Sequence, residues 1–283
     1  PDIAVADRDL SGTVITATQP ILVTTGTRCA RVPAREQPFG GFCDGIQEVV
    51  IPLAHWGSES FAAPSPPRDN EGHYWRIYAG AQGTTTFTTS PNVMTAENCP
   101  SPASYADGAC TPPQRGAWVE VAVPNGVGFT VAGVTEEDRL MVVGYLQSRH
   151  HPGEPENASA GEIGDPAMYQ VVSTETFDTH YVLAGGVGYE FEYIQIVRAA
   201  GAATVFINGD SVASWQQFGD YEVANETFPL SSVVVLDSQD AFGVTQFGYS
   251  DAGHVNPDCT QRSGLCSSSY AHPGGWTTSG STR

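Results

Sequence analysis

The sequence predicts an all-β protein made of two antiparallel β-sandwich modules in tandem, each tied by local disulfides. Helical periodicity is almost absent, and the apolar residues alternate with polar ones or form short runs between turn residues. The 31 glycines are spread along the chain and punctuate these runs. A related stretch also occurs twice, as YWRIYAGAQGTTTF at 74–87 and as YIQIVRAAGAATVF at 193–206, which favours two modules over one.

The first module is predicted over residues 1–152. Its opening strands lie in TVITATQPILVT (13–24), where a Thr-Gln-Pro turn separates two apolar runs. Short apolar runs bounded by turn residues predict the strands that follow. These lie at 49–53, 75–78, 84–88, 118–123, 128–131 and 140–146.

A polar stretch, HPGEPENASAGEIGDP at 151–166, interrupts the pattern, and we predict a linker over residues 153–166. The second module is predicted over residues 167–283 and includes a C-terminal loop and tail. Its strands show the same alternation of apolar runs and turns. They lie at 169–172, 181–183, 189–197, 203–207, 221–223, 232–236 and 242–249.

The two related stretches begin a longer correspondence. GAWVEVAV (116–123) follows the first stretch, and GDYEVANE (219–226) follows the second. Each half then closes with a charged turn and an apolar strand, EEDRLMVVGYL (136–146) and SQDAFGVTQFGY (238–249). TATQPILVTTG (16–26) is a weaker echo of that last element. We interpret the pattern as an internal duplication of a β unit of about a hundred residues.

The charge balance excludes several classes of partner. All 12 basic residues are arginines, and 31 acidic residues give a net charge of -19, which repels nucleic acid and anionic membrane surfaces. No apolar run approaches the roughly 20 residues that span a bilayer, so we expect no direct membrane insertion. The chain starts without Met or a signal region and ends in TTSGSTR, which resembles a Ser/Thr linker, so we expect a module of a longer protein.

Six cysteines fall into three couples that are close in the sequence. The couples are Cys29 with Cys43, Cys99 with Cys110, and Cys259 with Cys266. Each couple closes a loop rich in Pro, Gly and Ser, which a disulfide would fasten in an oxidising compartment. We predict local disulfides; metal binding or free thiols are the alternative, although none of the spacings is a CxxC zinc knuckle.

The strongest enzymatic motif is GDS at 209–211 with DAGH at 251–254, which resembles the serine and DxxH motifs of GDSL-type esterases. We do not favour this interpretation, because those enzymes carry the serine near the start of an α/β fold. Asn208-Gly209 is also a strong hairpin signal, so the motif is more simply a turn. No cofactor is predicted. Calcium between acidic loops is an alternative for which the sequence assigns no ligands.

Aromatic residues beside turns are the candidate interaction residues. Trp56, Trp276 and Tyr270 are candidate exposed anchors, because aromatic side chains dominate the energetics of protein interfaces. Trp75 and Trp118 lie within predicted strands and are predicted core residues.

The order of several short motifs resembles one known family. The motifs are QPILVTTG, CARVP, CDGIQEVVIPLAHWGSESF, YWRIYAGAQGTT, GAWVEV, LMVVGYL, GDPAMYQVVSTETFDTHY, YIQIVRAAGAATVFINGDSV, FGVTQFGY and SYAHPGG. Together they resemble the N-terminal domain of IgGFc-binding proteins over residues 11–275. The resemblance implies an extracellular interaction module and supports the pairing of Cys29 with Cys43. The loops that hold the other two cysteine couples look particular to this chain.

These observations predict a non-catalytic adhesion or recognition module of a secreted or cell-surface protein. Its partner would be an extracellular protein or a glycan, bound by loops at the sandwich ends. The alternative is a building block of a surface layer, sheath or filament, whose β-edges pair with copies of the same chain.

Overall fold

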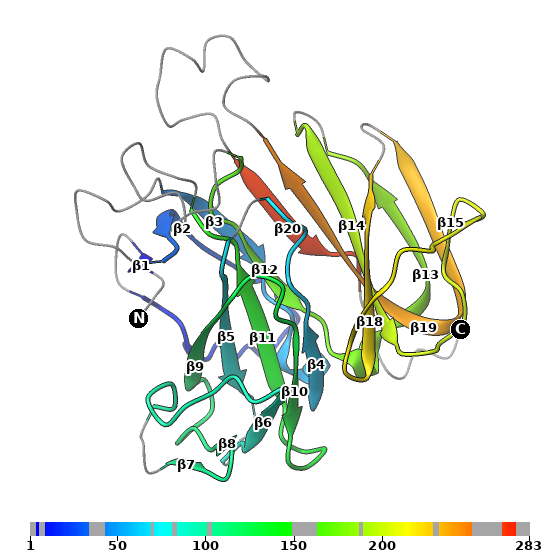
Figure 1. Ribbon diagram of the computed structural model, residues 1–283. Coiled ribbons are helices and arrows are strands. Elements are labelled where there is room, and N and C mark those ends of the chain that lie inside the picture. Colours follow the sequence, from blue (N-terminus) through cyan, green and yellow to red (C-terminus); the bar gives the residue numbers. More distant parts are fainter. Residues whose placement is uncertain are drawn as a thin grey trace.

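The computed structural model describes residues 4–5, 9–33, 43–68, 71–80, 84–100, 104–148, 163–186, 189–228, 232–250 and 268–275. Its helical elements in these residues are short 3-10 turns, among them Leu53–His55 and Thr174–Thr176, and the rest of the regular structure is antiparallel β-sheet (Figure 1). The predicted all-β class is therefore confirmed.

Two sheets form a sandwich in the first half of the fold, which extends to the end of β12. One has the strand order β12-β11-β5-β9 and the other has the order β4-β10-β6-β8-β7. The first contains β5 His73–Ala79, β9 Trp118–Val123, β11 Leu140–Tyr145 and β12 Met168–Val171. The second contains β4 Glu59–Ala62, β6 Phe87–Ser90, β7 Tyr105–Ala106, β8 Ala109–Cys110 and β10 Phe129–Gly133. Their alternate residues meet in the core, where Trp75 packs edge-on against Phe129 at 5.9 Å.

A third, N-terminal sheet covers the outer face of β12-β11-β5-β9. It consists of β1 Ala4–Val5, β2 Thr24–Arg31 and β3 Asp44–Val49. Ala30 and Ile46 of this sheet pack in one buried cluster with Met141, Val143 and Tyr145 of β11. Both faces of β11 are therefore buried, which explains why its sequence is a continuous apolar run rather than an alternating one.

The strands predicted in residues 13–23 do not form. This segment has no regular structure apart from a bend at 18–19, where the Thr-Gln-Pro turn was predicted. Its apolar side chains from Val14 to Leu22 are exposed, and Leu22 is 79% exposed. Sequence pattern alone shows that a stretch can form a strand, but the strand needs a neighbour to pair with.

The second half is built around β19 Val233–Tyr249, a strand of 17 residues. Its N-terminal part pairs with β13 Asp178–Ala184 and β15 Phe206–Ile207, and its C-terminal part pairs with β14 Phe191–Ala199 and β20 Ser269–Pro273. The remaining strands are β16 Asp210–Ser211, β17 Gln216–Phe218 and β18 Tyr221–Thr227. Because β19 belongs to both layers, the sheet folds over a core that includes Ile196, Leu236 and Phe242.

The two halves repeat the same strand neighbours. β5 lies between β9 and β11, and β14 lies between β18 and β19. In both halves a glycine faces a tyrosine of the adjacent strand: Gly144 pairs with Tyr169, and Gly248 pairs with Tyr270. A Cβ atom on either glycine would lie within 2.4 Å or 2.0 Å, respectively, of that tyrosine ring. These are the matches that a duplicated unit predicts, and the duplication itself stays a prediction.

The halves share a packed interface. Phe61 of β4 stacks on Tyr221 of β18 with ring centroids 4.9 Å apart, and the Gln195 amide donates a hydrogen bond to the Pro64 carbonyl at 2.7 Å. Phe247 belongs to the same core cluster as Trp75. The linker predicted at 153–166 lies mostly outside the described residues, and β12, beyond it in sequence, pairs with β11 of the first half. The predicted division into two modules stays a prediction.

Candidate functional site

A hollow of about 730 Å³ opens on the surface of the first half. Three parts of the chain line it: the N-terminal segment, the loop that precedes β7 and the residues at the start of β9. The lining residues are Ser11, Gly12, Glu97, Asn98, Cys99, Pro100, Gln114, Gly116, Ala117, Trp118 and Glu120. Its volume lies in the range of about 300 to 1,000 Å³ that small-ligand sites occupy.

Arg76 of β5 connects two of these parts, the N-terminal segment and β9. Its side chain is 2% exposed, its Nε donates a hydrogen bond to Glu120 Oε2 at 2.9 Å, and its Nη1 donates to Ser11 Oγ at 2.8 Å. Nη1 also lies 2.9 Å from Asp9 Oδ2. The guanidinium carbon stands 4.3 Å from the centre of the Trp118 ring, a cation–π contact. One buried cation therefore fixes the N-terminal segment, β9 and the Trp118 side chain relative to one another.

Two glycines allow the N-terminal segment to approach β9. Gly12 has φ +82° and Gly116 has φ +80°, backbone conformations that other L-residues rarely adopt. A Cβ atom on Gly12 would lie 2.3 Å from the Gly116 carbonyl oxygen, and one on Gly116 would lie 2.4 Å from the Gly12 carbonyl oxygen. The rim of the hollow at this point therefore depends on glycine at both positions.

The electrostatics of the hollow favour neutral or cationic ligands. Glu97 and Glu120 line the hollow, and Arg76 forms ion pairs with Glu120 and Asp9, in a chain of net charge -19. Burial raises the pKa of Asp9, but hydrogen bonds from Ser11 and the charge of Arg76 outweigh burial and hold it below its usual value. Asp9 is thus ionised at neutral pH, and an anionic ligand would meet net negative charge.

The groups available to a ligand differ from those that build the wall. The Asn98 amide donates to the Glu120 carbonyl at 3.0 Å and its oxygen accepts from the Thr95 N–H at 2.9 Å, so Asn98 shapes the loop. Glu97 and Gln114 are exposed, and Trp118 is half-buried. An aromatic ring, an amide and a carboxylate around one hollow can stack on and hydrogen-bond a polar ligand such as a sugar or a basic side chain.

The structure contains two of the three predicted disulfides. Cys29 is bonded to Cys43 and Cys99 to Cys110, with Cα atoms 5.0 and 6.0 Å apart. Cys99 also lines the hollow, so this disulfide fastens one wall of it. Cys259 and Cys266 lie outside the described residues.

The candidate anchors occupy different environments. Trp56 is half-buried rather than exposed: its Nε1 donates to the Ile51 carbonyl at 3.0 Å, and its ring packs against the cluster beneath the N-terminal sheet. Tyr270 is half-buried, donates its hydroxyl to Glu192 Oε1 at 2.7 Å and accepts from the Gln246 amide at 2.8 Å. Trp276 lies outside the described residues. Neither described residue lines the hollow.

Trp75 is buried as predicted, but Trp118, also predicted in the core, lines the hollow. The sequence held one signal for this difference. Arg76 takes the place of Gln195 in the duplicated stretch, and each pairs with the next strand, Arg76 with Glu120 and Gln195 with Asn225. The charged Arg76, at the position where the other half has the neutral Gln195, indicates that the surroundings of this position differ between the two halves.

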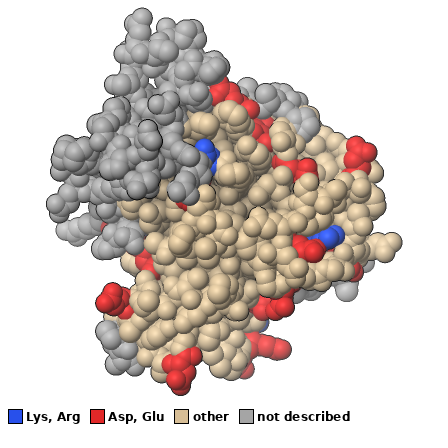
Figure 2. Space-filling model, viewed as in Figure 1, with Lys and Arg blue, Asp and Glu red and all other residues tan. Residues whose placement is uncertain are grey.

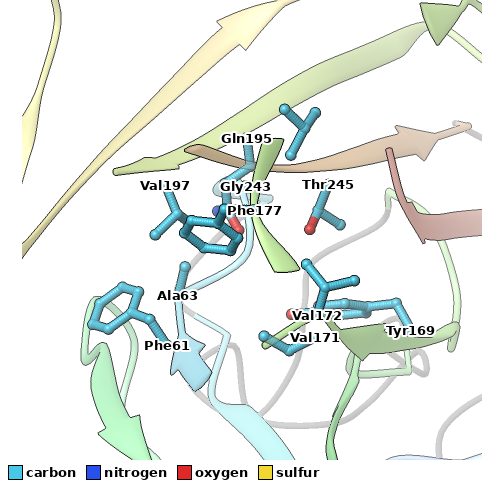
Figure 3. Close-up of a pocket in the computed structure, with 11 residues that line it drawn as sticks. Phe61, Ala63, Tyr169, Val171, Val172, Phe177, Gln195, Val197, Gly243 and Thr245 are labelled. Atoms are coloured by element: carbon cyan, nitrogen blue, oxygen red, sulfur yellow. The ribbon is translucent and has the colours of Figure 1, made fainter. Parts of the chain in front are cut away.

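A small cavity of about 20 Å³, room for about one water molecule, lies at the interface between the halves. Phe61, Phe177, Val197 and Tyr169 are among the side chains around it (Figure 3). Its apolar lining and size fit a packing gap rather than a ligand site.

The GDS motif lies in a hairpin. Asn208 and Gly209 have φ +52° and +93° and form the turn between β15 and β16, where Phe206 pairs with Ser211. The DAGH stretch lies outside the described residues. Among the residues that the structure describes, no group of three or more His, Cys, Asp and Glu side chains could hold a metal ion.

The charge distribution on one face is uneven. Figure 2 shows that Asp and Glu side chains lie mostly around the margin of this face, while its centre is largely uncharged. No helix in the described parts of the chain is long and apolar enough to cross a bilayer.

The described structure is a multi-sheet β framework with local disulfides and a polar hollow on its surface, an architecture in which loops can carry a site. Comparison with known proteins agrees. The family model for IgGFc binding protein matches residues 3–248, so the chain belongs to the IgGFc-binding family. Searches of curated proteins and of solved structures gave no significant match.

Proposed function

We propose that this chain is a non-catalytic recognition module of a secreted or cell-surface protein and that it binds an extracellular protein or glycan at the hollow. The observation that carries the proposal is the grouping of Trp118, Gln114 and Glu97 around a surface hollow of about 730 Å³. Membership of a family of binding modules and disulfides typical of oxidising compartments support it.

The ligand is expected to be neutral or cationic, because acidic side chains surround the hollow. Sugars present CH faces that stack on an aromatic ring and hydroxyls that bond amides and carboxylates, and a basic peptide side chain could use the same groups. The family description names the Fc part of IgG, which is therefore one protein to test. The loop with Cys99 and Cys110 looks particular to this chain and borders the hollow, so we do not assign that ligand.

The test is a screen of glycans, IgG Fc and basic secreted proteins, followed by titration of each hit against variants. Gln114→Ala and Glu97→Gln change exposed groups of the hollow and should each weaken binding about tenfold or less, with a larger loss in the double variant. Gln217→Ala, an exposed position in the second half, is the matched control. Unchanged affinity in the double variant would place the binding site elsewhere and contradict the proposal.

A second candidate function, self-assembly into a surface structure, is favoured by the exposed apolar residues at 13–22. The mass of the chain in solution across a concentration range separates the two functions: growth into polymers supports the building block, and a lasting monomer or small closed oligomer contradicts it.

We also propose that calcium binds between acidic loops, so the same series is run with and without millimolar calcium. A thermal midpoint unchanged by calcium would contradict that part.

A further inference from the structure

Residues 13–22, TVITATQPIL, form the most exposed apolar segment of the described chain. Every residue in it is exposed, with Val14 at 51%, Ile15 at 58%, Ile21 at 55% and Leu22 at 79%. Within the described structure, no backbone N–H or C=O group of residues 14–22 makes a hydrogen bond. The segment therefore presents both apolar side chains and unsatisfied backbone groups to solvent.

The sequence of the first arm, residues 13–17, suits a β-strand. Four of its five residues, Thr13, Val14, Ile15 and Thr16, are β-branched, and the next proline after the arm is Pro20. The arm shows no helical periodicity. An exposed, uncharged, strand-forming segment without proline is a site where another strand can pair.

The unbonded backbone groups of this segment indicate a β-strand as the partner, and the lack of charged residues in the segment indicates which strand. A regular row of free N–H and C=O groups along an arm matches the ladder of a paired strand, whereas a lipid chain offers no hydrogen-bonding groups. No charged residue occurs between positions 10 and 27, in a chain of net charge -19. Two copies of this chain can thus meet at this segment without bringing acidic side chains into contact, and antiparallel pairing of identical strands closes as a twofold dimer.

We propose that residues 13–17 of two copies of this chain pair as antiparallel strands about a twofold axis through Ile15. In this register Ile15 faces Ile15 of the second copy, Val14 faces Thr16, and Thr13 faces Ala17. Each cross-strand pair combines β-branched or small side chains, which stabilise antiparallel ladders. This surface does not include Trp118, Gln114 or Glu97, so the recognition proposal and this one can fail independently. A closed dimer at residues 13–17 is an alternative to polymer growth through the same segment, and the two exclude each other.

The interface is small, because one pair of short strands buries less than the roughly 1,000 Å² expected of a stable complex. The dissociation constant of the dimer is therefore expected to be micromolar or weaker, so the dimer forms only at concentrations above that value. Each copy carries a net charge of -19, so the copies repel each other at low ionic strength. Added salt should strengthen the dimer, the opposite of what an interface held by ion pairs would show.

Cysteine cross-linking tests the register. Facing Cβ atoms in an antiparallel pair lie about 4.5 to 5.5 Å apart, close enough for an Ile15→Cys pair to be oxidised with little movement. Val134→Cys is the matched control, since Val134 is 60% exposed and lies in a turn of the same half. The Ile15→Cys chain should form a disulfide-linked dimer at least about tenfold faster than the control. Equal rates would overturn the proposed register.

Sedimentation equilibrium of the unmodified chain tests the dimer itself. We expect a monomer–dimer equilibrium that Ile15→Asp weakens at least about tenfold and that Val134→Asp leaves unchanged. Hydrogen exchange should show slower exchange of alternate amides within residues 13–17 in the dimer, because only every second residue of a strand bonds to the facing strand. A monomer at every concentration and salt level, polymers instead of dimers, or a dimer whose residues 14–17 remain unprotected would overturn the proposal. Unfolding temperatures of both variants check that the fold is retained.

Discussion

At the scale of single residues, a few buried polar groups decide local chemistry. Arg76 is tied to Glu120, Ser11 and Asp9, and it positions Trp118 at the hollow. Glu48 on β3 is half-buried, and burial raises its pKa from 4.5 to about 7, although hydrogen bonds from Val49 and Gln170 oppose the shift. Such a carboxyl group makes stability depend on pH.

Glu48→Gln tests this dependence. Because the pKa of Glu48 is raised in the folded state, its contribution to stability is fully present below pH 4.5 and is lost as pH rises through about 7. The variant should therefore unfold at a higher temperature than the unmodified chain at pH 8 and at nearly the same temperature at pH 4. Thermal unfolding from pH 4 to 8 measures the difference. Glu136→Gln, at an exposed turn position, is the control and should show no such trend.

At the scale of elements, the disulfide between Cys99 and Cys110 attaches the loop before β7 to strand β8. Cys110 belongs to β8, and its bond to Cys99 closes the loop whose first residues line the hollow. Both sulfur-bearing side chains are buried, at 0% and 4% exposed. The disulfide thus connects a core position with a wall of the candidate site.

Replacing both residues, Cys99→Ala with Cys110→Ala, should lower the free energy of unfolding by about 2 to 4 kcal/mol, because a loop of this length gains that much entropy in the unfolded chain. Ligand affinity at the hollow should fall as well, since its wall is released. The matched pair Cys29→Ala with Cys43→Ala should lower stability but leave affinity unchanged. Denaturant unfolding and ligand titration of both double variants provide the comparison, and equal affinity in the two would contradict the role given to the loop.

At the scale of the whole molecule, a buried ion pair links segments from both halves. Arg68 and Glu71 have side chains 0% and 1% exposed and form an ion pair. Arg68 also donates to the carbonyls of Gln147 at 2.8 Å and Ile163 at 3.3 Å, and its guanidinium carbon lies 5.1 Å from the Tyr249 ring centre. The interface between the halves therefore contains a charge that cannot be left unpaired.

Arg68→Met should lower the free energy of unfolding by about 3 to 5 kcal/mol, because it leaves the Glu71 carboxylate buried without its partner. Adding Glu71→Gln should recover a large part of that loss. Because the halves share a core, the unmodified chain should unfold in a single transition by both fluorescence and circular dichroism. Separate transitions for the two halves, or a loss below about 1 kcal/mol for Arg68→Met, would contradict this account.

Sequence and structure account for different parts of this molecule. Alternating apolar runs and the repeated stretch at 74–87 and 193–206 were enough to predict the β class and the central strands, because strand periodicity and turn residues are local properties of the chain. Motif order was enough for the family, and sequence proximity was enough to pair Cys29 with Cys43 and Cys99 with Cys110.

Tertiary structure decided everything that depends on a partner distant in sequence. Residues 14–22 have the sequence of strands, but their backbone has no neighbour to pair with in the described structure. Trp118 has the pattern of a core residue but borders a hollow that the N-terminal segment and the Cys99 loop create. The approach of Gly12 to Gly116 and the contact of Arg76 with Asp9 join segments more than sixty residues apart. Sequence periodicity specifies which side chains share a face, but only the folded chain determines what that face meets.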